Sequence, residues 1–159
     1  MRKFFADGYF GQMEEGQDLV AAGYAGLAGT RLIAETKRQE LTGRFAAGYL
    51  DRLACFQEYP VVLEREQREL KDWEPFGATE CESAGEGGIL AAVWNLSGAY
   101  RLGVEFSLRK IPLKQETIEI CEFFGLNPYR IYSGGCWLLA SKNGGRTVEE
   151  LAGQGVHGA

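Results

Sequence analysis

The spacing of apolar residues predicts where the chain forms helices and strands. Residues 89–100 place apolar side chains at intervals of 4, 3 and 4, as Ile89, Val93, Leu96 and Tyr100. This spacing puts them on one face of an amphipathic helix. Residues 102–108 then change to strict alternation, which predicts a strand with one buried face.

Similar patterns predict the rest of the chain. Helices are expected over residues 26–37, 40–57, 62–73 and 111–124 and from residue 147, and strands over residues 18–24, 76–82 and 131–141. Residues 1–15 show no period and are expected to form an irregular arm. Residues 136–140, CWLLA, are apolar at every position, so we expect them in a central strand. Strands and helices alternate irregularly, which predicts a single α+β domain.

The helix expected over residues 62–73 is mostly charged and has little apolar face. It could be a partner-binding surface. A solvated surface helix, stabilised by pairs of opposite charges, is the favoured interpretation.

Composition narrows the classes of partner and compartment. The 159 residues carry 17 Lys and Arg against 22 Asp and Glu, a net charge of −5, so nucleic acid and anionic membranes are not expected partners. No apolar run approaches the roughly 20 residues that span a membrane. The four cysteines lack C-x-x-C spacing and the single histidine, His157, is near the end, so no metal site is expected. These features predict a reduced, cytoplasmic protein.

A glycine-rich turn before the helix at residue 89 is the main candidate for chemistry. Backbone N–H groups of Gly85, Gly87 and Gly88 could hold an anion at the helix start. Glu86 would repel a phosphate there, so a packing role is favoured over anion binding. The turn at Ser133 and Gly134 could likewise approach a ligand closely or serve only as a tight turn.

Carboxylates form a second candidate site beside this turn. Glu80 and Glu82 lie two apart on the predicted strand and therefore on one face, with Glu86 beyond the turn. Three such groups could bind Mg²⁺ or act in acid–base chemistry. Acids at the exposed end of a strand are the favoured interpretation. No Ser-His or Cys-His pair can be assembled, so no catalytic residue is assigned.

The order of these segments resembles the carboxy-terminal domain of the AIR synthase-related superfamily, especially its HypE-like hydrogenase-maturation branch. The resemblance covers residues 16–159. It is carried by a strand followed by G-x-x-G-T and a helix, by the turn that ends in Glu86-Gly87-Gly88, by Gly125-Leu126-Asn127-Pro128, and by Ser133-Gly134-Gly135 before the apolar strand. It implies an α+β fold with helices packed on one face of a mixed sheet. It also points to Glu82, Ser83, Gly85, Glu86, Gly87, Gly88, Ser133 and Gly134 as candidate ligand-binding residues.

The chain departs from the family pattern at positions that matter for activity. Glu82 and Ser83 stand where the family has His-Asp, and no motif of the family's amino-terminal ATP-binding domain is present. We therefore expect a stand-alone domain that binds a ligand or partner without independent catalysis. The alternative is the substrate-side half of a split ATP-dependent enzyme, with ATP and Mg²⁺ supplied by a separate amino-terminal domain. The expected partner of the chain is either a second copy of the chain or the protein that carries the amino-terminal domain.

Overall fold

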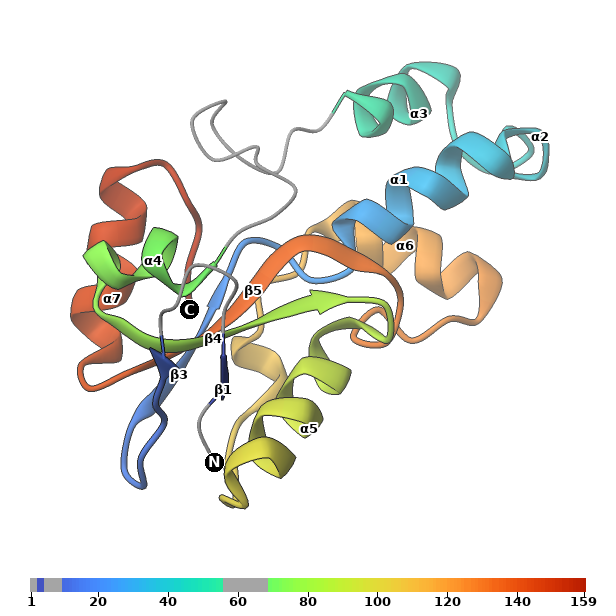
Figure 1. The fold of residues 1–159 in the computed structure, drawn as a ribbon. Coiled ribbons are helices and arrows are strands. Elements are labelled where there is room, and N and C mark those ends of the chain that lie inside the picture. The colour runs from blue at the N-terminus through green and yellow to red at the C-terminus, as the bar shows by residue number, and fades with distance from the viewer. Residues whose placement is uncertain (1–2, 5–9, 56–68) are drawn as a thin grey trace.

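The computed structural model describes residues 3–4, 10–55 and 69–159 (Figure 1). Its main sheet contains three strands, β3 (Asp18–Ala22), β4 (Ala78–Gly85) and β5 (Ser133–Ser141), in the order β3-β5-β4. Both pairings are antiparallel. The central position expected for the apolar strand is therefore confirmed. Two shorter strands, β1 (Lys3–Phe4) and β2 (Phe10–Gly11), pair within the arm that was expected to be irregular.

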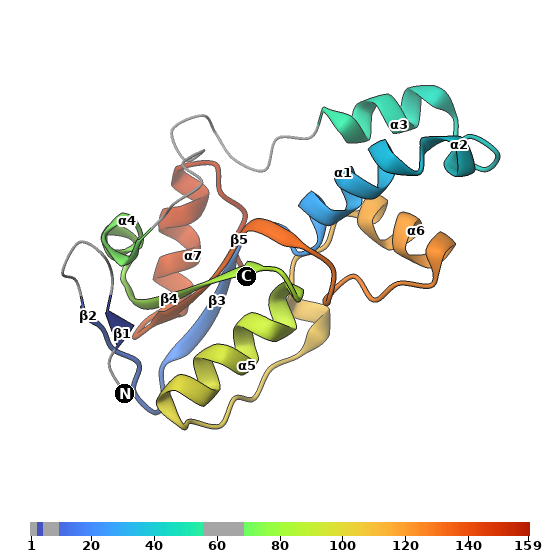
Figure 2. The same ribbon diagram turned by 45° about the vertical axis from the view of Figure 1, so that its right-hand side comes forward.

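Residues 136–140 of β5 are apolar at every position, and helices cover both faces of this strand. On one face, Cys136, Leu138 and Ala140 belong to a buried cluster with α5 (Gly88–Tyr100). On the other, Trp137 and Leu139 pack in a cluster with α4 (Leu70–Trp73) and α7 (Gly144–Gly153). Figure 2 shows β3 and β4 between α7 and α5. The α+β class is confirmed, with two corrections: helices lie on both faces, and the described strands form an antiparallel rather than a mixed sheet.

A third cluster lies beyond one end of the sheet (Figure 1). It joins α1 (Leu27–Thr36), α2 (Arg38–Leu41), α3 (Ala47–Ala54) and α6 (Gln115–Phe124) around buried aliphatic side chains: Ala34, Leu41, Leu50, Leu53 and Ile120. The Tyr49 hydroxyl on α3 donates a hydrogen bond to Glu119 Oε2 on α6, at 2.6 Å. This bond, with a second from Gln115, lowers the pKa of the Glu119 carboxyl.

The single helix expected over residues 40–57 is wrong in the part that the structure describes, because the chain breaks between α2 and α3. Twelve residues of continuous helix would separate Leu41 from Leu53 by about 18 Å. The break, in which Ala46 is extended, lets both side chains join Ile120 in one buried cluster. Most of the helix expected over residues 62–73 lies outside the described residues, and its last turn is α4.

The strand expected over residues 102–108 is also wrong. Residues 102–107 have no regular secondary structure and lead into a 3₁₀ turn, η3 (Leu108–Lys110). Alternation alone does not make a strand, because a strand also needs a neighbour to pair with. The other predicted strands and helices are confirmed to within a few residues at each boundary, including the stop of α6 at Gly125, whose φ is 65°.

We predict that Leu139→Ala lowers the free energy of unfolding by about 2–5 kcal/mol, because it opens a cavity in the middle of the central strand. Leu139 is fully buried. Urea denaturation followed by circular dichroism measures the change. Leu32→Ala is the matched control, since Leu32 is 50% exposed on α1 and its truncation should change stability by less than about 0.5 kcal/mol. Equal losses in the two variants would contradict the arrangement of the sheet.

Candidate functional site

The glycine-rich turn connects β4 to α5 and packs against the loop before β5. Gly87 is the N-cap residue of α5 with a φ of 82°, and Gly88 follows with a φ of 72°. A Cβ atom on Gly88 would lie 2.4 Å from the Tyr129 carbonyl oxygen. The Leu90 N–H at the start of α5 donates to that same oxygen at 3.3 Å. The favoured packing role therefore has a structural basis, because only glycine permits this approach and a neighbouring carbonyl occupies the helix start.

Ser133 is brought opposite Gly85 but uses its hydroxyl within the fold. The two residues are register partners at the end of the β4–β5 ladder. The Ser133 hydroxyl accepts a hydrogen bond from the Gly26 N–H at 2.7 Å and donates one to the Ile131 carbonyl at 3.0 Å. Its side chain is fully buried. Ser133 therefore anchors the start of α1 to the start of β5.

Gly134 lies directly beneath an aromatic ring. A Cβ atom there would be 2.3 Å from the Tyr132 hydroxyl oxygen, so a side chain at this position would displace the ring. Tyr132 itself is 43% exposed. The close approach that the sequence suggested is thus made by a side chain of the same chain.

The acidic residues near the turn differ in their burial and in the direction of their side chains. Glu82 lies opposite Leu138 and Ser83 opposite Trp137, so these two neighbours point to opposite faces of the sheet. Glu86 is exposed at the turn. Glu80 shares the face of Glu82, as the alternation predicted, but is fully buried.

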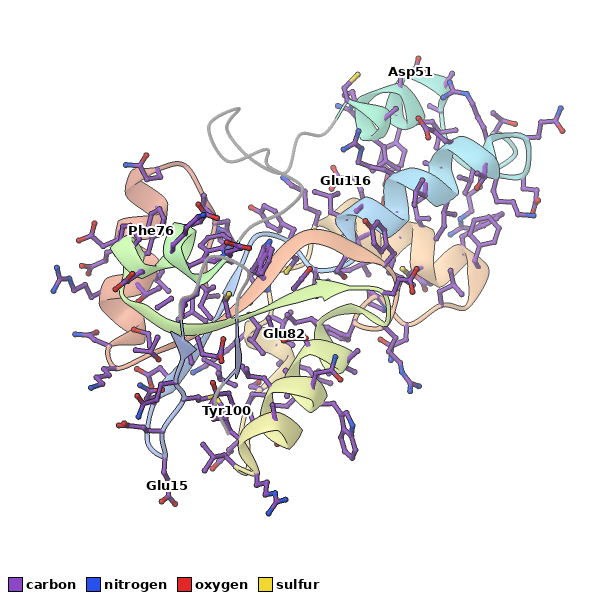
Figure 3. All side chains as sticks on the ribbon, in the orientation of Figure 1. Glu15, Asp51, Phe76, Glu82, Tyr100 and Glu116 are labelled. Atoms are coloured by element: carbon purple, nitrogen blue, oxygen red, sulfur yellow. The ribbon has the colours of Figure 1, made fainter. Side chains whose placement is uncertain are left out.

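The Glu80 carboxylate is part of the packing of α5 on the sheet. It accepts hydrogen bonds from the Tyr100 hydroxyl, at the end of α5, and from the Cys81 N–H at 2.9 Å. Figure 3 labels Glu82 and Tyr100 on the side of the sheet that α5 covers. A fully buried carboxylate needs such donors to offset the cost of its desolvation. Of the predicted acidic site, the structure thus gives Glu80 a structural role and leaves Glu86 facing solvent.

The described residues were searched for metal-binding groups and for membrane-spanning helices. Residues 3–4, 10–55 and 69–159 contain no group of three or more His, Cys, Asp or Glu side chains arranged to hold a metal ion. In the same ranges, none of the helices combines the length and the apolar character needed to cross a membrane. Burial raises the pKa of the Cys121 thiol to about 11, which keeps this buried side chain protonated at neutral pH.

A cavity that the sequence did not predict lies beside β3. It has a volume of about 670 Å³ and is bounded by β3 with its preceding turn, by α5, by residues 102–111 and by the start of α7. Its walls also include Leu138 of β5 and Ala159, so they come from six separate parts of the chain and no local motif could identify it. The signal that was present is the alternating segment at residues 102–108, whose strand-like pattern has no pairing strand among the residues that the structure describes.

We predict that Gly88→Ala lowers the free energy of unfolding by more than about 1 kcal/mol, because a methyl group collides with the backbone of residues 129–131 at a positive φ. Gly98→Ala is the matched control. Gly98 lies inside α5 with nothing within 4 Å of its added Cβ atom, so this change should stabilise the protein by about 0.5–1 kcal/mol. Thermal and urea unfolding distinguish the two variants, and a neutral Gly88→Ala would contradict the packing role of the turn.

Comparison with known proteins places this geometry in a known fold. No protein-family model matches the chain, and no curated protein matches it. Several solved structures match the chain. The HypE of E. coli aligns with a TM-score of 0.62 at 19% identity, over 89% of this chain and 41% of HypE.

Two further structures give the same result. HypE in a HypE–HypF complex aligns with a TM-score of 0.61 at 15% identity, over 89% of this chain and 43% of that one. HypE in complex with ATP aligns with a TM-score of 0.59 at 14% identity, over 91% and 40%. The chain therefore spans about 40% of the length of the HypE proteins that it resembles. It shares the α+β fold of the part of HypE with which it aligns, as the order of its segments predicted.

Proposed function

We propose that this chain is an AIR synthase-related domain of the carboxy-terminal type that binds a partner or ligand and has no independent catalytic activity. The observation that carries the proposal is that the fold itself uses polar groups at and beside the predicted ligand site. The hydroxyl of Ser133, one of the predicted ligand-binding residues, has partners within the chain, as do two neighbouring groups, the Leu90 N–H and the Glu80 carboxylate. Groups held in this way support the structure and are not presented to a substrate.

The exposed part of the candidate site remains available for binding. Ser83, Glu86 and Gly87 are exposed, and Glu82, Gly85 and Gly134 are half-buried. These residues surround the junction of β4, β5 and α5. They would form a shallow contact surface for a ligand or partner, with Gly88 and Ser133 as its buried support.

Large apolar side chains on the surface support a protein partner. Trp94 is 79% exposed in the middle of α5. Exposed aromatic residues of this kind often contribute much of the binding energy of protein interfaces. Other large apolar residues that are at least 38% exposed are Leu32, Phe106, Leu108, Ile118, Phe123, Leu126 and Tyr132.

A second candidate function is the substrate-side half of a split ATP-dependent enzyme. It is favoured by the similarity to HypE solved with ATP and to HypE in complex with HypF, together with the 40–43% of those proteins that the chain covers. In this case a separate polypeptide would carry the amino-terminal domain, and that domain would bring ATP and Mg²⁺ to the complex. Both candidates give the chain a cytoplasmic protein partner.

We predict that the purified chain does not hydrolyse ATP in the presence of Mg²⁺, because the Ser133 hydroxyl at the candidate site and the neighbouring Glu80 carboxylate are hydrogen-bonded within the fold. Phosphate release at micromolar protein measures turnover, and fluorescent ATP measures binding. E. coli HypE is the control for nucleotide binding. Turnover by the chain alone would contradict the binding function, whereas turnover that appears only with a separate ATP-binding domain would establish the split enzyme.

We also predict that the chain forms a homodimer, with a mass in light scattering of twice its 17.6 kDa. A second copy of the chain was an expected partner from the sequence. Helices cover both apolar faces of β5, so the prediction depends on the exposed side chains of α5. Trp94→Ala should shift the mass towards the monomer, and Leu32→Ala on α1 should not. A monomeric mass at high concentration would contradict the dimer.

A further inference from the structure

The side of α5 that faces away from the sheet has the residue spacing of a helix–helix interface. Its positions are separated by 3, 4, 3 and 4 residues, as Gly87, Leu90, Trp94, Ser97 and Arg101. All five are exposed or half-buried, whereas the buried residues of α5 lie on the opposite side of the helix. This is the heptad spacing by which two helices pack along their length. We call these five residues the outer seam of α5.

The outer seam is arranged symmetrically about Trp94. This residue is the middle one of the 13 in α5, and its side chain is 79% exposed. Two copies of α5 that pack antiparallel about a twofold axis at Trp94 bring together residues equally far from it in sequence. Leu90, four residues before Trp94, would then face Gly98 of the other copy, four residues after it. A large side chain would thus lie opposite a position that has none.

The two ends of the outer seam carry opposite charges. Glu86 lies beside Gly87 at one end, Arg101 forms the other end, and both side chains are exposed. Within the part of the chain that the structure describes, neither makes an ion pair or a side-chain hydrogen bond. In the antiparallel arrangement, Arg101 of each copy lies beside Gly87 and Glu86 of the other, so the charge pair forms twice. A parallel arrangement would instead place like charges together at both ends.

Arg101 ends α5 in a backbone conformation that favours glycine. Its φ is 54°, and its N–H donates to the Ser97 carbonyl. Among residues 3–4, 10–55 and 69–159, Arg101 alone has a positive φ without being glycine. This conformation is unfavourable for a residue with a side chain, and glycine would end the helix more easily. The presence of an arginine here therefore supports a role for its side chain beyond the helix stop.

We propose that two copies of this chain associate through the outer seam of α5, antiparallel, with the twofold axis at Trp94. Each Trp94 indole is buried against the other copy, and Glu86 of each copy pairs with Arg101 of the other. A contact limited to one helix of each copy is small beside a standard interface of about 800 Å² per partner, so we expect a dissociation constant in the micromolar range. The inference depends on the proposed partner-binding function and names the partner and the contact surface.

Sedimentation equilibrium of the full chain at concentrations up to about 0.5 mM tests the proposal. Trp94→Ala should raise the dissociation constant of the dimer at least tenfold, because it removes the central aromatic anchor. Glu86→Arg and Arg101→Glu each place like charges opposite one another at two contacts. Each should raise the dissociation constant by about three- to thirtyfold.

Glu149→Arg is the matched control for the charge reversals. Glu149 is exposed on α7, which packs on the other face of the sheet, and this substitution changes the net charge as Glu86→Arg does. It should alter the dissociation constant by less than about twofold, because surface charges distant from an interface are screened by salt. Circular dichroism verifies that every variant is folded.

The double variant Glu86→Arg with Arg101→Glu tests the antiparallel arrangement. It exchanges the two charges and restores an attractive pair at both ends, so its dissociation constant should return to within about threefold of the original value. A mixture of the two single variants should form a heterodimer, because one chain then carries two cations at these positions and the other carries two carboxylates. In a parallel pair the single variants would lose no affinity, since like charges would face each other before and after each change.

Three results would overturn the inference. They are a chain that stays monomeric throughout this concentration range, a dimer that Trp94→Ala or the single charge reversals do not weaken, and a double variant that does not recover. Each of these leaves the proposed function standing, because a different protein could still be the partner. ATP hydrolysis by the chain alone, assayed on the same preparation, is the separate result that would overturn the proposed function.

Discussion

The architecture depends on the burial of β5 on both faces. Cys136, Leu138 and Leu139 are buried on opposite sides of one strand, and neither side can be left to solvent without a large loss of hydrophobic stabilisation. Helix α5 covers one side, while α4 and α7 cover the other. These helices constrain the segments that connect them to the sheet. The glycine-rich turn must reverse the chain directly after β4 so that α5 packs on its face of the sheet. Strands β3 and β4 form the two edges of the sheet.

The same constraint explains why the glycine-rich turn resembles a ligand site. Gly87 and Gly88 have positive φ values, and Gly88 leaves less than a methyl group's space beside Tyr129. In phosphate-binding loops, similar freedom lets the backbone approach an anion. Here the approaching group is another part of the backbone. The hydroxyl of Ser133 serves the same junction, since it joins α1 to the start of β5.

Binding is therefore best sought on surfaces where the fold has not used its own groups. One such surface is α5, which exposes a large aromatic side chain, Trp94. The chain aligns with about 40% of the length of HypE. The proposed partner-binding function assigns such surfaces to a separate protein.

Local patterns in the sequence were sufficient to determine some elements of the fold. The helix at α5, the stop of α6 at Gly125 and the central position of β5 follow from side-chain spacing, a residue that tolerates positive φ, and apolar character on both faces. At the candidate site, the sequence identified the turn, and correctly placed Glu80 and Glu82 on one face. Tertiary structure alone decided whether an element is continuous or paired. It broke the helix after Leu41 so that Leu53 could reach the same cluster, and within the described part of the chain it left residues 102–107 without a strand partner. It also formed the cavity beside β3 from distant segments. These outcomes depend on contacts between residues far apart in the chain, which no local spacing records.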